Sequence, residues 1–152
     1  MDAFDKKILS ILQKDCTTSV SDIAEQVGLS NSPCWRRIQT LEKSGVIKGR
    51  VALVDPEKVK VGLTVFVMVK TSHHNPEWLD KFTHMVKTFP EIMEFYRLSG
   101  DIDYLLRIVV PDMKAFDTFY KKLITQVDFF DISSSFAMEE IKFTTQLPLD
   151  YL

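Results

Sequence analysis

The order of apolar patterns between residues 63 and 143 constrains the fold more than any other feature of this sequence. Strand-like runs rich in β-branched residues alternate with stripes at helical spacing. The expected strands lie at 63–71, at 92–98, at 103–110 and within 130–143. One expected helix begins at Asn75 or Pro76, after the first strand, and the other begins at Pro111 and Asp112, after the third. This β-α-β-β-α-β order predicts an α+β domain with a split, ferredoxin-like arrangement.

Both helices of such a domain cover one face of the sheet. Their predicted core positions are apolar at helical spacing, namely Trp78, Phe82, Met85 and Val86 in the first and Met113, Phe116, Phe119, Tyr120 and Leu123 in the second. The strand at 63–71 is apolar on both faces, so the side of the sheet without helices also carries apolar side chains. We therefore expect a second copy of the chain to cover it, which makes the protein a homodimer.

The first 55 residues follow a helical period instead. Asp2 is expected to cap a helix with Phe4, Ile8, Ile11 and Leu12 on its apolar face, and Ser19 a second one that ends at Gly28. A third helix begins after Ser30 or Ser32 and runs to about Ser44 and Gly45. A short helix, a turn and a helix predict a helix-turn-helix, and residues 46–54 are expected to form a short hairpin that serves as a wing.

The third helix has a basic outer face. Cys34, Ile38 and Leu41 lie on one stripe and should face the core, while Arg36 lies opposite them. Residues 30–50 hold five Lys and Arg against Glu42 alone, although the whole chain has a net charge of −2. Arginine and glutamine can read base edges, and serine and lysine can hold phosphate. We therefore expect double-stranded DNA to contact Ser30, Asn31, Ser32, Pro33, Trp35, Arg36, Arg37, Gln39, Thr40, Lys43, Lys48 and Arg50.

Several of these residues could instead have a purely structural role. Arg36 and Arg37 could be a solvated pair on an ordinary helix, and Trp35 could pack at the edge of the domain. Cys34 lies on the buried stripe, which favours a small core residue over a redox sensor.

Composition excludes several classes of protein. The longest apolar stretch is far short of the ~20 residues that span a membrane, and the acidic start of the 152-residue chain is unlike a signal peptide. Two cysteines are too few for a disulfide framework. We expect a cytoplasmic protein without membrane contact, with a DNA-binding domain at 1–55, a linker at 56–62 and a second domain with a C-terminal tail at 63–152.

Catalytic, metal and cofactor sites are not expected. Asp101 and Asp103 alternate along a strand and lack a nucleophile or an orienting partner. Adjacent His73 and His74, even with His84, lack a further ligand that would complete a metal site. No Gly-rich phosphate loop is present.

Several segments resemble one family. Leu29-Ser-Asn-Ser-Pro-Cys-Trp-Arg-Arg-Ile38 and Leu41-Glu-Lys-Ser-Gly-Val-Ile47 resemble the recognition helix of Lrp/AsnC (feast/famine) regulators. The version with Pro33-Cys34-Trp35 resembles the members that respond to individual amino acids. Residues 98–106 resemble the glycine and acid hairpin of the family's sensing domain, and 138–142 and 144–149 resemble its closing segment.

The resemblance implies dimers that assemble further, to octamers, and a free amino acid as effector in a cleft between dimers. It points to Leu98, Gly100, Asp101, Ile102, Asp103, Tyr104, Ser134, Ser135 and Phe136. An aspartate could meet the ammonium group, turn amides and serine hydroxyls could hold the carboxylate, and Phe136 could face the side chain. Alternatively, the aspartates serve a tight turn and residues 133–135 a polar strand face.

The sequence thus predicts a sequence-specific transcriptional regulator whose DNA binding or assembly responds to a small amino acid. One alternative is a DNA-organising protein of the same fold that needs no effector. Another is an enzyme of amino-acid metabolism.

Overall fold

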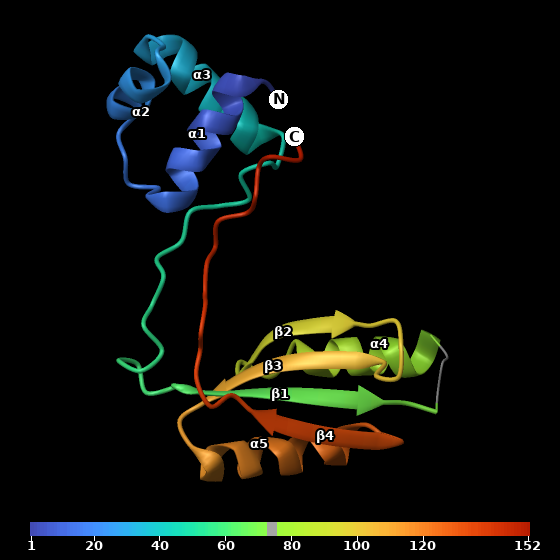
Figure 1. The fold of residues 1–152 in the computed structure, drawn as a ribbon. Coiled ribbons are helices and arrows are strands. Elements are labelled where there is room, and N and C mark those ends of the chain that lie inside the picture. Colours follow the sequence, from blue (N-terminus) through green and yellow to red (C-terminus); the bar gives the residue numbers. More distant parts are fainter. Residues whose placement is uncertain (73–75) are drawn as a thin grey trace. The chain divides into compact units, whose positions relative to one another are not determined.

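The computed structural model describes residues 1–72 and 76–152, and the chain divides into two compact units (Figure 1). The helical unit comprises Met1–Leu53 together with Ile141–Leu152, and the sheet unit comprises Val54–Glu140. Residues 73–75 lie outside the described part, so the predictions for His73, His74 and Asn75 are not addressed by it. None of the helices in the described part is both long and apolar enough to cross a bilayer.

The helical unit contains α1 (Ala3–Lys14), α2 (Val20–Val27) and α3 (Asn31–Lys43). The Asp2 carboxylate accepts hydrogen bonds from the backbone N–H groups of Phe4 and Asp5, which confirms the predicted cap of α1. Ser19 caps α2 in the same way, and Gly28 ends α2 in the left-handed conformation at φ 75°. Ser30 is the N-cap of α3, so the helix begins two residues before Pro33.

The core of the helical unit confirms the predicted buried stripe of α3. Its buried members are Ile8, Leu9, Ile23, Ala24, Val27, Cys34, Ile38 and Leu41. Phe4, which the sequence places on the apolar face of α1, is 37% exposed instead. The reason is its position in the first turn, where its ring lies under a guanidinium rather than in the core.

The predicted wing hairpin is wrong: residues 46–54 form no strand. Val51 and Leu53 are 75% and 67% exposed, so these apolar side chains have little packing that would stabilise a hairpin. An isolated two-stranded hairpin is marginal at best in water unless a further strand or a helix packs against it.

The tail from Ile141 to Leu152 belongs to the helical unit, although the sequence places it at the end of the second domain. Gln13 on α1 holds it by two hydrogen bonds to the backbone of one residue: the Leu147 N–H donates to Oε1 at 2.7 Å and Nε2 donates to the Leu147 carbonyl at 3.3 Å. Lys6 donates to the carbonyl of Leu152, and Leu149 packs against the core. The chain therefore passes between the two units twice, after Leu53 and after Glu140.

Replacing Gln13 by alanine should release the tail from α1. We expect the stability of α1 to fall by about 1 kcal/mol, because both bonds to Leu147 are lost. Hydrogen exchange of the α1 amides measures this directly. Gln26→Ala, at an exposed position of α2, is the matched control, and equal protection in both variants would contradict the role of the tail.

The sheet unit contains β1 (Leu63–Lys70), α4 (Pro76–Val86), β2 (Ile92–Arg97), β3 (Tyr104–Val110), α5 (Met113–Gln126) and β4 (Asp131–Phe136). The strands pair antiparallel in the order β2-β3-β1-β4. This is the predicted α+β architecture, with the crossovers through α4 and α5 (Figure 1).

The core of the sheet unit lies between both helices and one face of the sheet. Its members include the four predicted residues of α4 and, from α5, Phe116, Phe119 and Leu123. Met113 is 57% exposed, contrary to the prediction, because a side chain in the first helical position points back beyond the start of the helix. Tyr120 is only partly buried against the core.

The opposite face of the sheet carries apolar side chains together with one ion pair. Register and alternation place half-buried Phe66, Met68 and Leu105 there. Arg107 lies on the same face and pairs with Glu94 at 2.9 Å, which lowers the pKa of the Glu94 carboxyl. This face is apolar around one ion pair, and neither α4 nor α5 packs against it.

Candidate DNA-binding and effector sites

The outer face of α3 carries most of the predicted DNA contacts. Arg36 is exposed and lies on the side of α3 away from buried Cys34 and Ile38. Exposed with it are Ser30, Asn31, Ser32, Pro33, Trp35, Thr40, Lys43, Lys48 and Arg50. Their polar and basic groups form a surface that could hold phosphates and read base edges.

Trp35 is 53% exposed. Its ring borders a shallow hollow of about 270 Å³, together with Val20 at the start of α2 and Asn31 and Ser32 on α3. The edge-packing interpretation therefore leaves half of the indole open, and the predicted DNA contact is sterically available. Cys34 on the other side is fully buried, and burial raises the pKa of its thiol. A raised pKa leaves less of the thiol as the reactive thiolate, which agrees with the interpretation of Cys34 as a core residue.

Gln39 and Arg50 have partners within the helical unit. Gln39 Nε2 donates to Glu42 Oε2 at 2.9 Å, and Arg50 pairs with Glu42 Oε1 at 2.9 Å. Arg50 also donates to the Cys16 carbonyl at 3.4 Å. The Thr40 hydroxyl donates to the Arg36 carbonyl, and this bond does not involve the Arg36 side chain. Glu42, the one acid between residues 30 and 50, thus organises two predicted contacts.

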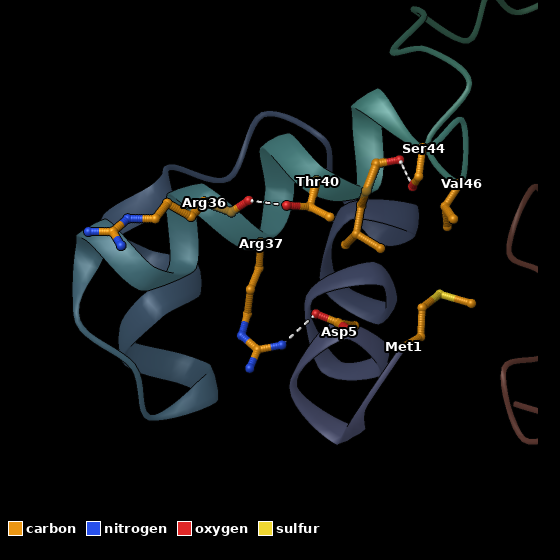
Figure 2. A pocket seen from close by; sticks show the side chains of 8 residues that line it. Met1, Asp5, Arg36, Arg37, Thr40, Ser44 and Val46 are labelled. Atoms are coloured by element: carbon orange, nitrogen blue, oxygen red, sulfur yellow. Dashed lines mark hydrogen bonds and ion pairs between the residues drawn. The ribbon is translucent and has the colours of Figure 1, made fainter.

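Arg37 does not share the direction of Arg36. Its Nη1 lies 2.8 Å from Asp2 Oδ2 and 2.9 Å from Asp5 Oδ1, both in the first turn of α1. Figure 2 shows Arg37 pointing from α3 to Asp5, while Arg36 extends along α3. The bonds to Asp5 and then to Asp2 raise the pKa of Arg37, and the Asp5 N–H followed by Arg37 lowers the pKa of Asp2. The sequence analysis predicted Asp2 as the cap of α1 but did not predict that Asp2 and Asp5 hold Arg37.

In the sheet unit, the predicted effector hairpin is a tight turn between β2 and β3. The Leu98 N–H donates to the Asp103 carbonyl at 2.8 Å, and Gly100 has φ 132°, a conformation that favours glycine. The Thr71 N–H donates to Asp103 Oδ2 at 2.8 Å, so the Asp103 carboxylate also secures the end of β1. Asp101 is exposed at the tip.

Tyr104 belongs to the core rather than to a surface site. Its side chain is 5% exposed, and its ring stacks on Phe95 at 5.5 Å. Leu98 is 41% exposed beside the turn, and Ile102 is half-buried. The accessible part of the predicted hairpin is therefore Leu98 to Asp103, of which Ile102 and Asp103 are half-buried.

The predicted residues of β4 do not converge. Ser134 and Phe136 pair with Val67 and Val65 and share their helix-covered face, whereas Ser135 lies on the opposite face. The Phe136 ring packs on Phe116 of α5 at 5.1 Å. A strand with a period of two cannot present all three to one ligand.

Register also separates β4 from the hairpin within one chain. Lys70 pairs with Asp131 at the start of β4, and Thr71, the next residue, contacts Asp103. Phe136 lies at the other end of β4. A cleft lined by both the hairpin and Ser134–Phe136 would therefore need residues from more than one chain.

Metal-ligand groups of three or more His, Cys, Asp or Glu were not found within residues 1–72 and 76–152. His84 is an exposed residue of α4. The metal interpretation that combines it with His73 and His74 rests on residues outside the described ranges.

Comparison with known proteins supports both units. Residues 1–48 match a winged helix-turn-helix DNA-binding domain, and residues 64–147 match the Lrp/AsnC ligand binding domain. The DNA-binding transcriptional activator DecR of Escherichia coli is 49% identical over 99% of both chains. The glutamate uptake regulatory protein of Zymomonas mobilis is 50% identical over 98% of this chain and 91% of its own.

Solved structures agree over the whole length. An AsnC family transcriptional regulator from Agrobacterium tumefaciens is 58% identical, with a TM-score of 0.97 over 100% of this chain and 99% of its own. A transcriptional regulator of Neisseria meningitidis in complex with L-Met is 37% identical, with a TM-score of 0.94 over 99% and 98%.

A helix-turn-helix unit with a basic, exposed second helix, joined to a ligand-binding α+β domain, defines a DNA-binding regulator with a sensing domain. The chain belongs to the Lrp/AsnC family of transcriptional regulators.

Proposed function

We propose that this regulator reads DNA through the outer face of α3 and that a free amino acid at the sensing hairpin changes its DNA binding or assembly. The observation that carries the first part is the orientation of Arg36, which projects from α3 opposite the buried stripe of Cys34, Ile38 and Leu41. We propose no chemical reaction for the chain, which acts by binding in the cytoplasm.

The amino-acid effector is supported by the relatives and by the hairpin. One relative is a glutamate uptake regulator and another is solved with L-Met. The turn at Gly100 presents backbone amides next to Asp101, a pairing suited to the carboxylate and ammonium of an amino acid. The Pro33-Cys34-Trp35 sequence supports a member tied to an individual amino acid rather than one of the global leucine-responsive type.

Dimerisation is proposed through the face of the sheet that α4 and α5 do not cover. Phe66, Met68 and Leu105 lie there at positions that alternate with the buried residues of β1 and β3. A second copy would remove this apolar surface from water and would place two α3 helices on one duplex. We propose further assembly to octamers, in which the hairpin of one dimer and β4 of another could line one cleft.

The mechanism is then a shift between assemblies. A ligand held between dimers favours the assembly in which its contacts are complete, and this changes the spacing of the α3 helices on DNA. Coupling of about 1–3 kcal/mol between the two sites is typical.

The test is a thermal-shift screen of the full chain against the twenty amino acids, followed by DNA-binding titrations with each hit. A ligand at ~100 times its dissociation constant adds about 2.7 kcal/mol to stability. A raised midpoint that also changes DNA affinity supports the proposal. Salt-dependent, weakly specific DNA binding that none of the twenty changes would instead indicate the DNA-organising alternative.

Asp103→Asn separates the two roles of that carboxylate. The amide oxygen can still accept the Thr71 N–H, whereas the charge that would meet an ammonium group is removed. We expect the effector response to fall about tenfold or more while thermal stability changes little. The response is read as the amino-acid concentration at half effect on DNA binding. Asp112→Asn, which changes the cap of α5 beyond the other end of β3, is the control. An unchanged response in Asp103→Asn removes this residue from the site.

A further inference from the structure

Arg36 and Arg37 are adjacent on α3 but have different surroundings. Three side chains at the start of α1 converge on the Arg37 guanidinium: Asp2 at 2.8 Å, Asp5 at 2.9 Å and the Phe4 ring, whose centroid lies 5.3 Å from Cζ. Figure 2 shows the bond between Arg37 and Asp5. No comparable contact holds the Arg36 guanidinium within the described residues.

The acceptors of Arg37 are themselves held in place. Asp2 Oδ1 accepts the N–H groups of Phe4 and Asp5, and Asp5 Oδ2 accepts the Asp2 N–H at 2.9 Å. Each carboxylate thus uses one oxygen for the cap of α1 and the other for Arg37. The side chain of Asp5 is only 15% exposed. The capping bonds that begin α1 also fix the positions of the two carboxylates that accept the guanidinium.

Charge argues against a phosphate contact at this place. One guanidinium between two carboxylates leaves a local charge of −1, so a phosphate that approached Arg37 would meet two acids. Within residues 1–72 and 76–152, no acid forms an ion pair with Arg36 on the outer face.

We propose that Arg37 is a positioning residue: its bonds to Asp2 and Asp5 set the rotation of α3 on α1, and thereby the direction in which Arg36 faces DNA. Apolar contacts of Cys34, Ile38 and Leu41 attach α3 to the core but are not directional. A guanidinium between two fixed carboxylates is directional. This inference rests on the proposed use of the α3 outer face for DNA.

The test measures DNA affinity and its salt dependence for the full chain, with a duplex selected by the wild type from a randomised pool. Arg36→Ala, which removes a phosphate or base contact, is expected to reduce the salt slope by about one charge. Arg37→Ala is expected to weaken binding about 3- to 10-fold with an unchanged slope. A slope reduced by one in Arg37→Ala would make Arg37 a direct contact and overturn the proposal.

Asp5→Asn gives an opposite sign for the two interpretations. If Arg37 contacted DNA, neutralising Asp5 would free it and raise affinity; as a positioning residue, it loses its charged partner and affinity falls. The effects of Asp5→Asn and Arg37→Ala should also be less than additive, because they break one interaction. Additive effects, or a gain of affinity in Asp5→Asn, would contradict the proposal.

Two controls keep the outcomes distinct. Asp22→Asn neutralises another capping acid, in the first turn of α2, and should leave affinity unchanged or raise it slightly. Arg37→Lys keeps the positive charge but not the planar guanidinium. If Arg37→Ala weakens binding only by destabilising the fold, Arg37→Lys should retain most of the affinity. Loss of binding equal to that of Arg37→Ala, with normal thermal stability, would show that the planar guanidinium itself is needed. If Arg36→Ala leaves both affinity and slope unchanged, the proposed DNA face fails, independently of Arg37.

Discussion

Arg36→Ala is expected to weaken binding to a selected duplex by about 10- to 100-fold, the range for one lost base or phosphate contact. Arg36 is exposed on α3 and lies opposite the buried stripe, so its removal leaves the core of the helical unit intact. Fluorescence anisotropy with labelled DNA at fixed salt measures the loss, and size-exclusion chromatography should show unchanged assembly.

The matched control is Arg97→Ala, which removes an exposed arginine from the end of β2 in the sheet unit. It changes the net charge equally and should leave DNA affinity within about twofold. Equal losses in both variants would mean that Arg36 acts only through the overall charge.

Phe82→Ala is expected to lower the free energy of unfolding of the sheet unit by about 3–5 kcal/mol. Phe82 is 0% exposed, and its ring contacts those of Trp78 at 4.9 Å, Phe95 at 5.0 Å and Phe129 at 5.5 Å. Alanine would leave a cavity at the centre of this cluster, where helix and sheet meet, and the rings around it are too bulky to close it.

Urea denaturation at a fixed protein concentration, followed by circular dichroism, measures the effect. Phe130→Ala is the control, because the Phe130 side chain is 74% exposed and its loss should change stability by no more than about 0.5 kcal/mol. A loss below about 1 kcal/mol in Phe82→Ala would show that this aromatic cluster does not hold the unit together.

Much of the fold follows from local patterns. The caps at Asp2, Ser19 and Gly28 and the buried stripe of α3 were predicted from residue type and spacing, and the structure confirms them. The order of strands and helices in the sheet unit was predicted in the same way. These features depend on contacts between residues a few positions apart, which the sequence displays directly.

The candidate sites depended more on tertiary structure. Spacing put Arg36 and Arg37 on neighbouring parts of one helix, yet α1 captures only Arg37, through acids 35 and 32 positions away in the chain. Alternation along β4 was readable from sequence, but which face α5 would cover decided that Phe136 is a packing residue.

Patterns in the sequence were enough to predict the helices and strands from α1 to β4 in order and most of the residues that face each core, because apolar periodicity encodes burial within a segment. Three features became visible only in the folded chain: Gln13 on α1 binds the tail at Leu147, residues 46–54 form no hairpin, and Arg37 pairs with Asp2 and Asp5 at the start of α1. The contacts of Gln13 and Arg37 depend on partners distant in the chain, and the pattern of a single segment does not show which distant residue it will contact.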